Sequence, residues 1–304
     1  MTGTTETERI APLVHPYTPE QLRELGGRMD RVPGPRALGG TAQRFFRLTW
    51  MLAYLDFKLK FFGSILGYAW QLFKPLMMFG VLYVVFTKVL DLGGNTPHYG
   101  VMLLSGIVLF GFFSESTVGA IGSVLGAEGL IRKISFPILA IPLASVTSVF
   151  LTLFLNYGVV LIFALANGIT PNPRWIEIIP LLLLLYVVAA SVAVTLSAWF
   201  VRFRDVQPIW EVFAQVLFYA TPVIYPISRV TQKHPELAKV IMCNPVAAII
   251  EQMRHAVIDP TAPSTVDVLG HAWLLVIPLG IVVALAVTGF VSISRMAPRV
   301  AEEL

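Results

Sequence analysis

Residues 134–173 read ISFPILAIPLASVTSVFLTLFLNYGVVLIFALANGITPNP and contain no Asp, Glu, Lys or Arg. A helix of about 20 apolar residues can cross the hydrocarbon core of a bilayer, which is about 30 Å thick. Three further charge-free runs occupy 92–114, 178–201 and 268–294. Several runs of this length in one chain predict an all-α, polytopic membrane protein.

The composition of the whole chain agrees with membrane insertion. Of its 304 residues, 56% are hydrophobic and 13% are charged, and the mean hydropathy is +0.75. Soluble domains carry about 25% charged residues, so these values exclude a disordered chain, a coiled coil and an ordinary soluble enzyme. The single cysteine, Cys243, excludes a disulfide within the chain and a metal site built from cysteines.

The charge-free runs and the turn-forming residues between them predict six spans, at about 72–90, 101–122, within 138–166, 177–200, 208–225 and 271–293. With the N-terminus in the cytoplasm, 16 of the 22 Lys and Arg residues fall on the cytoplasmic side. Basic residues favour that side of short loops, so both termini are predicted to be cytoplasmic. The polar first forty residues then form a cytoplasmic tail rather than a signal peptide. The net charge of +4 reflects this topology and does not indicate a nucleic-acid partner.

Two segments do not fit simple spanning. Residues 44–62 combine an apolar stripe, an aromatic opposite face and basic residues at both ends, as is typical of a helix lying in the membrane interface. An extra span is the alternative, and Asp56 with the flanking charges disfavours it. Residues 226–270, predicted to be external, contain an apolar stretch at 240–250 that is too short to span, so a re-entrant or surface-lying helix pair is expected. The apolar stripe of 44–62 consists of Leu48, Leu52, Leu55, Leu59 and Phe62.

Sequence patterns for catalysis are absent from the chain. It has no G-x-x-x-x-G-K-[S/T] phosphate loop, no H-x-x-x-H or H-E-x-x-H metal pattern and no G-x-S-x-G nucleophile elbow. The chain is therefore expected not to bind ATP in the P-loop manner, not to hold a metal ion and not to be an enzyme.

One acidic residue, Glu115, is predicted near the middle of the second span, in LFGFFSEST. An ionised side chain at the centre of a span costs about 2.5–3.5 kcal/mol on insertion scales, so it should face protein or water. Two interpretations stay open: a proton relay, or a carboxyl group hydrogen-bonded within a helix interface. A second acid, Glu211, lies one turn inside the fifth span and is expected to pair with Arg202 and Arg204.

Aromatic residues are dense in the first and fifth predicted spans. Rings within spans usually pack helices together or anchor them at the interface. A pore lined by rings is the alternative, and it would suit sugars, whose C–H faces stack on aromatic faces. The rings are Trp70, Phe73, Phe79, Tyr83 and Phe86 in the first span, and Trp210, Phe213, Phe218, Tyr219 and Tyr225 in the fifth.

Four blocks in a fixed order resemble a known family. They are FKLKFFGSILGYAWQLFKPLMMFGVLYVVF, GLIRKISFPILAIPL, VRFRDVQPIWEVFAQVLFYATPVIYPIS and NPVAAIIEQMR. In this order and spacing they resemble the membrane (permease) subunit of ABC transporters that export polysaccharides such as O-antigen, capsule and teichoic acid. The resemblance covers about 44–295.

The resemblance implies a domain organisation and partners. Residues 1–43 lie outside the resemblance and are expected, from their polar composition, to be a cytoplasmic tail. After the tail, 44–62 would be an interface helix, 63–295 a six-helix transmembrane domain and 296–304 a cytoplasmic C-terminus. Within the transmembrane domain, 226–258 would form external gate helices and 128–136 a coupling helix. Two copies of this chain would pair with two ATP-binding subunits, which would bind the ATP and Mg, so no cofactor is expected in this chain. The location would be the bacterial inner membrane.

The resemblance also implies candidate site residues. The first and fifth spans of both copies would line a channel, with Phe73, Tyr83, Trp210, Phe213 and Tyr219 as its aromatic lining. The substrate would be a glycan on a polyprenyl diphosphate lipid. Basic groups at headgroup level attract phosphate, so the diphosphate or ordinary anionic lipid would meet Arg44, Arg47, Lys58 and Lys60. The coupling helix would contact the ATPase through Glu128, Ile131, Arg132 and Lys133.

Two other functions stay open. The same fold could export a drug or a small lipid. The aromatic content and the block GSILGYAW argue against this alternative. A polyprenyl-dependent membrane glycosyltransferase would need acidic or metal-binding residues at one membrane face, and the Asp and Glu residues here are too dispersed.

Overall fold

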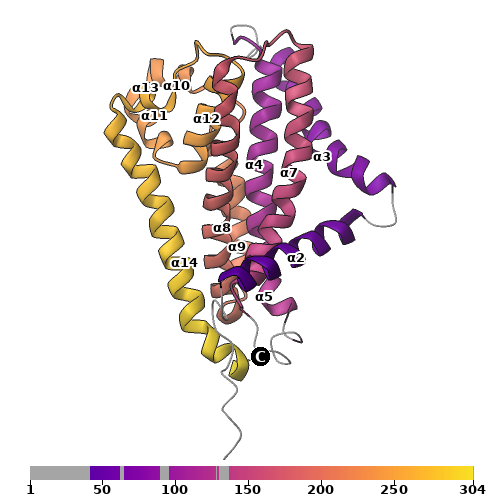
Figure 1. Cartoon of the computed structure of the whole chain (residues 1–304). Coiled ribbons are helices and arrows are strands. Elements are labelled where there is room, and N and C mark those ends of the chain that lie inside the picture. Colours follow the sequence, from indigo (N-terminus) through magenta and orange to yellow (C-terminus); the bar gives the residue numbers. More distant parts are fainter. Residues whose placement is uncertain (1–41, 62–64, 90–95, 128, 130–136, 304) are drawn as a thin grey trace, which may run out of the picture. The chain divides into compact units, whose positions relative to one another are not determined.

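The computed structural model describes residues 42–61, 65–89, 96–127, 129 and 137–303 (Figure 1). Within these ranges every regular element is a helix. Five helical stretches there are long and apolar enough to cross a membrane: Ala69–Val89, Tyr99–Ile121, Ala140–Ala166, Pro173–Arg202 and Ala272–Met296. The prediction of an all-α, multi-pass membrane protein is thus confirmed.

The five stretches combine long α-helices with short turns of other helix types. The second and third are single helices, whereas the other three carry a π-helical or 3-10 turn at one end. The elements are α3 (Ile65–Val84) with η1 (Val85–Val89), α4 (Tyr99–Ile121), α7 (Ala140–Ala166), η2 (Pro173–Glu177) with α8 (Ile178–Arg202), and η3 (Ala272–Leu275) with α14 (Val276–Glu303).

The fifth predicted span, 208–225, is shorter in the structure. Helix α9 (Val206–Ala220) has 15 residues, which corresponds to roughly 22 Å against the 30 Å or so of a hydrocarbon core. The helix stops because Pro222 follows Thr221, and a residue before proline is pushed out of the helical region. Thr221 accordingly has φ −92° and ψ 142°. The described residues therefore give five full-length candidate spans and one shorter apolar helix.

Helix α4 is the centre of the fold. It packs against α3, α7, α8, α9 and α12, and 78% of its most apolar window is buried, because it is apolar on all sides. By contrast, the most apolar window of the stretch Ala69–Val89 contains no fully buried residue. Helix α3 therefore touches the rest of the chain on one side and leaves its remaining surface uncovered.

Helix α14 packs along α8. The two backbones come close at Gly289, where an added Cβ would lie 2.9 Å from Thr195 Oγ1 and 3.1 Å from the Ser191 carbonyl oxygen. An added Cβ would need Thr195 to move and the two helices to separate by a few tenths of an ångström, so glycine allows their close approach.

Helix α2 (Ala42–Phe61) coincides with the predicted interface helix and packs against α7. Its buried residues are Phe45, Thr49 and Ala53, whereas Leu55 and Leu59 of the expected stripe are exposed. The stripe that meets α7 is thus offset from the predicted one, because the small Ala53 allows close packing where a leucine would not.

Four short helices occupy the segment predicted to be external: α10 (Ile227–Lys233), α11 (Pro235–Met242), α12 (Pro245–Val257) and α13 (Thr265–Leu269). Proline at the first position starts both α11 and α12, where its missing N–H costs nothing. The Asn244 side chain caps α12 by accepting a hydrogen bond from the Val246 N–H at 3.0 Å. Helix α12 is buried against α4 and α8.

Candidate functional site

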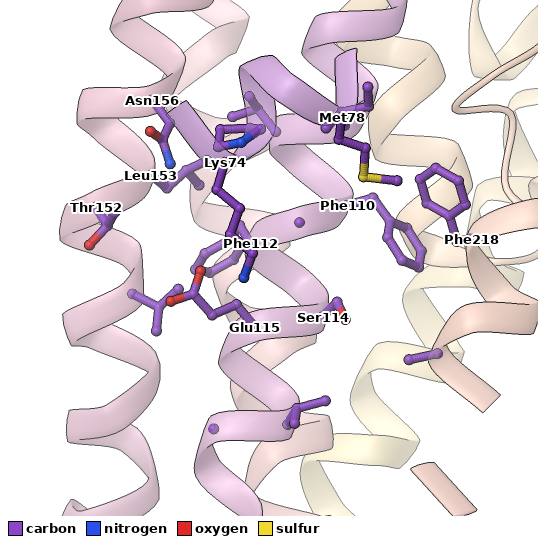
Figure 2. Close-up of a pocket in the computed structure, with 18 of the residues that line it drawn as sticks. Lys74, Met78, Phe110, Phe112, Ser114, Glu115, Thr152, Leu153, Asn156 and Phe218 are labelled. Atoms are coloured by element: carbon purple, nitrogen blue, oxygen red, sulfur yellow. The ribbon is translucent and has the colours of Figure 1, made fainter. Parts of the chain in front are cut away.

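A cavity of about 660 Å³ lies between α3, α4, α7 and α9 (Figure 2). Its volume falls within the range of about 300–1,000 Å³ that is usual for ligand pockets. Most of its wall is apolar, as expected within a membrane protein, but each of the four helices also contributes polar groups. These polar side chains are Gln71, Lys74, Ser114, Glu115, Thr152, Asn156, Glu211 and Gln215.

Glu115 lies on the wall of this cavity, six residues before α4 ends at Ile121. It is thus about 9 Å from that end of the helix, not near the middle of the span as the sequence suggested. Its carboxylate accepts hydrogen bonds from Gln71 Nε2 at 3.2 and 3.5 Å, and Lys60 Nζ lies 3.8 Å from Oε1. One carboxylate therefore ties together α2, α3 and α4.

The surroundings of Glu115 match the hydrogen-bonded interpretation rather than an isolated proton site. The Glu115 and Lys60 side chains are 40% and 43% exposed, so solvent or substrate can reach the pair. Figure 2 shows the Lys74 side chain extending from α3 toward Glu115. The carboxylate thus lies among cationic and amide groups on an open cavity wall.

The expected pairing of Glu211 with Arg202 and Arg204 is not found among the described contacts. Glu211 instead accepts a hydrogen bond from Gln207 Nε2, one turn earlier on α9, at 3.1 Å. The Arg204 guanidinium lies 5.3 Å from the centre of the Phe200 ring. The arginine turns toward α8 because an aromatic face is available there, and Glu211 is left on the cavity wall.

The five candidate channel aromatics lie in different surroundings. The side chains of Phe73, Phe213 and Tyr219 are 50%, 51% and 59% exposed, and Tyr219 lines the cavity. Trp210 is half-buried instead, and its Nε1–H donates a hydrogen bond to Thr117 Oγ1 at 3.0 Å. With Tyr83, which is 39% exposed, four of the five are exposed, whereas Trp210 holds α9 against α4.

Tyr83 belongs to a separate cavity of about 500 Å³ at the other end of α3. Its ring packs on Phe79 with centroids 5.4 Å apart, and it lies against Gly100, where an added Cβ would come within 3.2 Å of the tyrosine ring. The structure therefore does not bring Tyr83 together with the α9 aromatics within one chain.

The four basic candidates lie along α2 but not at one point. Arg47 and Lys60 are 13 residues apart, a distance of roughly 20 Å along a helix. One diphosphate cannot contact both ends, so Arg44 and Arg47 form one position and Lys58 and Lys60 another. Of these, Lys60 faces Glu115 beside the cavity. The coupling candidates Glu128, Ile131, Arg132 and Lys133 lie outside the described residues.

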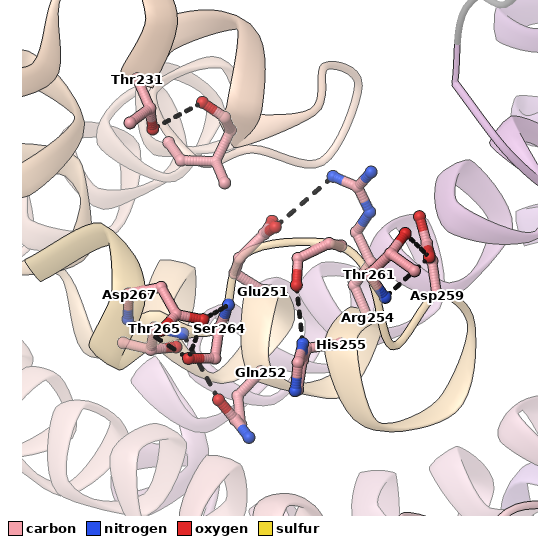
Figure 3. Close-up of polar contacts among 12 residues, drawn as sticks. Thr231, Glu251, Gln252, Arg254, His255, Asp259, Thr261, Ser264, Thr265 and Asp267 are labelled. Atoms are coloured by element: carbon pink, nitrogen blue, oxygen red, sulfur yellow. Dashed lines mark hydrogen bonds and ion pairs between the residues drawn. The ribbon is translucent and has the colours of Figure 1, made fainter.

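A buried ion pair lies in α12, outside the five candidate spans (Figure 3). Arg254 Nη1 donates to Glu251 Oε1 at 3.4 Å, and the two residues are 5% and 0% exposed. Within the described ranges, Glu251 Oε2 and Arg254 Nε have no hydrogen-bond partner. Burial raises the pKa of Glu251 from its ordinary value of 4.5 to about 7, with Arg254 opposing the rise and Asp259 adding to it.

Hydrogen bonds hold α12 to the start of the α8 stretch. Gln252 Nε2 donates to Glu177 at 2.9 Å, and Asn172 Nδ2 donates to the Ala256 carbonyl at 3.2 Å. Arg174 also contacts His255. These bonds anchor α12 to the segment that leads into α8.

Sequence reasoning missed the polar face of α7 and the buried pair in α12. Ser145, Ser148, Thr152 and Asn156 recur at helical spacing within the charge-free run, which was a readable signal. Glu251 and Arg254 are also three residues apart within NPVAAIIEQMR. Only burial distinguishes that pair from an ordinary surface pair, and burial is not visible in the sequence.

Comparison with known proteins gives a consistent result. Residues 47–258 match the family model described as ABC-2 type transporter. A curated relative from Klebsiella pneumoniae, the O-antigen export system permease protein RfbA, is 27% identical over 217 residues, which are 71% of this chain and 82% of the relative. A protein of the same name from Myxococcus xanthus is 25% identical over 230 residues, covering 75% of this chain and 86% of the relative.

Proposed function

The chain belongs to the ABC-2 type transporter family, and on this premise we propose that it is the permease subunit of an ABC transporter that exports a polysaccharide. The observation that carries the proposal is the match from α2 to α12, together with curated relatives named as O-antigen export permeases over more than two thirds of the chain. The substrate in this proposal is a glycan attached to a polyprenyl diphosphate lipid in the inner membrane of a bacterium.

The proposed subunit works as a pair of identical copies. Two surfaces support this: α3 has no fully buried residue in its most apolar window, and in α9 only Ala214 is buried. Two helices with uncovered apolar sides and open aromatic rings can face the same helices of a second copy. The space between the copies would then be lined by Phe73, Phe213 and Tyr219, whose exposed rings offer stacking surfaces to a moving glycan.

The proposed topology keeps six crossings with both termini in the cytoplasm. Helix α9 and the turn 221–225 together make the fifth of these six crossings, and an even number agrees with the concentration of basic residues on one side. Residues 226–258 then form the external gate helices above the channel, and 44–62 lies along the inner leaflet.

A separate subunit supplies the energy in this proposal. The 304 residues contain no phosphate loop, so ATP and Mg would be bound by two partner subunits. Residues 128–136 would be the segment that contacts them. The permease itself is a transport subunit with no catalytic step of its own.

The proposed function is tested by deleting the gene in its own organism. Loss of one surface glycan, with accumulation of its lipid-linked precursor on the cytoplasmic side, is the expected result. Expression of the full chain from a plasmid should restore the surface glycan. Unchanged surface glycans with no accumulated precursor would contradict the function.

A further inference from the structure

Helix α7 carries a polar stripe along one face. Ser145, Ser148, Thr152 and Asn156 are three, four and four residues apart, which places them one above the other on a helix. Thr152 and Asn156 line the cavity of about 660 Å³, and Figure 2 shows them at successive heights on α7. Ser145 and Ser148 line a second cavity of about 350 Å³, together with residues of α2. Each residue of the stripe therefore lines one of these two cavities.

Two atoms of this stripe are buried and have no hydrogen-bond partner among the residues that the structure describes. One is the Oγ of Ser148, a residue that is 1% exposed. The other is the Oδ1 of Asn156. More than 90% of buried polar groups in proteins are paired, so each exception needs an explanation. Packing alone does not provide one, since alanine and leucine would fill the same space without the cost of an unpaired polar atom. A ligand that supplies the missing partners does explain them.

The two cavities meet at one ion pair. Lys60 lines the smaller cavity, and its Nζ lies 3.8 Å from Glu115, which lines the larger one. From Ser145 to Asn156 the stripe rises by eleven residues, or roughly 16 Å. The larger cavity then continues past α4 to Gln215 and Tyr219 of α9. A polar path therefore leads from α2 along α7 and beneath α3 to the aromatic side of α9.

The groups along this path indicate the chemistry of the ligand. Three acids, Asp56, Glu115 and Glu211, outnumber two bases, Lys60 and Lys74, and the other polar groups are hydroxyls and amides. A phosphate site would need an excess of positive charge. Sugar hydroxyls both donate and accept hydrogen bonds, and a mixture of carboxylate, amide, hydroxyl and ammonium groups offers both kinds of partner.

We propose that the polar stripe of α7, with Glu115 and Gln71 opposite it, binds the sugar of a lipid-linked glycan before the glycan reaches the α9 side. This inference rests on the proposed function, because that function supplies a sugar attached to a membrane lipid. The apolar side chain of Leu155 lies beside the stripe, is exposed and offers a surface for the lipid chain.

The test measures binding of two probes to the purified permease by native mass spectrometry in detergent. The probes are N-acetylglucosaminyl-diphospho-undecaprenol and undecaprenyl diphosphate, which differ only in the sugar. The test variant is Ser148→Ala with Asn156→Leu. The matched control is Thr147→Val, which removes a hydroxyl group of α7 that is already paired with Tyr186 at 2.9 Å and lines neither cavity.

The expected result is that the wild type binds the sugar-bearing probe more tightly than the sugar-free one. The double variant should lose at least tenfold in affinity for the sugar-bearing probe, with unchanged affinity for the other. Its thermal stability should not fall, because the substitutions remove unpaired buried atoms. Thr147→Val should bind both probes as the wild type does. If the double variant does not fold, Ser148→Ala alone, which deletes one oxygen, should give a smaller loss in the same direction.

Equal binding of the two probes by the wild type, or equal losses for both in the variant, would overturn the sugar site, as would unchanged binding in the variant. Those outcomes leave the deletion experiment unaffected. If deletion of the gene also leaves every surface glycan in place, the proposed function itself is wrong.

Discussion

Replacing Glu251 by glutamine should make the protein more stable at pH 8. With a pKa of about 7 in the folded protein and an ordinary value of 4.5, Glu251 binds its proton more tightly when folded. Folding stability from this group is therefore greatest at low pH and falls as the pH rises from 4.5 to 7. A shift of this size corresponds to about 3 kcal/mol. Glutamine resembles the neutral carboxyl group and does not suffer this loss.

The geometry around Glu251 favours this substitution. A glutamine Oε1 can accept the hydrogen bond that Arg254 Nη1 now donates at 3.4 Å. The other carboxylate oxygen, which the amide nitrogen would replace, has no partner to lose in the part of the chain that the structure describes. The expected gain is about 3 kcal/mol at pH 8 and about 1 kcal/mol at pH 5, where most of the folded protein already carries the proton.

The assay is thermal unfolding of the purified protein in detergent, followed by tryptophan fluorescence between pH 5 and pH 9. The difference between variant and wild type at each pH cancels the titration of other groups. At about 2–4 °C per kcal/mol, as for domains of 150–250 residues, the variant should unfold roughly 6–12 °C higher at pH 8. The matched control is Glu236→Gln, which breaks the exposed pair with Lys239 and should change little at any pH.

The opposite result would refute the reasoning. If Glu251 is ionised and the ion pair with Arg254 stabilises the fold, removing its charge leaves a buried arginine uncompensated, at a cost of about 3–5 kcal/mol. Glu251→Gln would then unfold at a lower temperature, most clearly at pH 8. A difference that does not change between pH 5 and pH 9 would also exclude the raised pKa.

Three further predictions concern transport. Purified alone, the chain should hydrolyse no ATP above background, because it has no phosphate loop. Robust ATP turnover by the isolated permease would contradict the proposal that separate subunits hydrolyse the ATP. In a background lacking Cys243, Thr170→Cys should react with an impermeant thiol reagent in intact cells and Asp205→Cys only after lysis; the reverse pattern would invert the proposed topology. Phe213→Leu and Tyr219→Leu keep apolar bulk at exposed rings, so each should fold normally and lower glycan export at least threefold; export at the wild-type rate by both would refute the aromatic channel.

The long helices were predictable because the length of a charge-free run decides whether a segment can span. The second span was expected at 101–122 and is found at Tyr99–Ile121. The early end of α9 was harder to predict, because a proline can end a helix or start one: Pro222 follows the end of α9, whereas Pro235 begins α11. The composition of a segment therefore predicted which helices are long and apolar, whereas the residues at which helices end depended on local backbone geometry.

The site was less predictable because its contacts join distant parts of the sequence. Glu115 was recognised as unusual, but its partners Lys60 and Gln71 are more than forty residues away on other helices. The spacing of the polar residues of α7 could be read from the sequence. Only the structure shows that Ser148 lines a cavity, which is what suggests a binding role. The coupling role of 128–136 stays a prediction, because those residues lie outside the described ranges apart from Gly129.

The most direct test of the central claim is transport in inverted membrane vesicles that contain the permease and its ATP-binding partner. A labelled lipid-linked glycan is supplied on the outer face of the vesicles, which corresponds to the cytoplasm, and a glycosidase is added after incubation with ATP. The account predicts that glycan becomes protected from the glycosidase only when ATP, the partner and this chain are all present. Protection in vesicles without this chain, or no protection when all three are present, would contradict it.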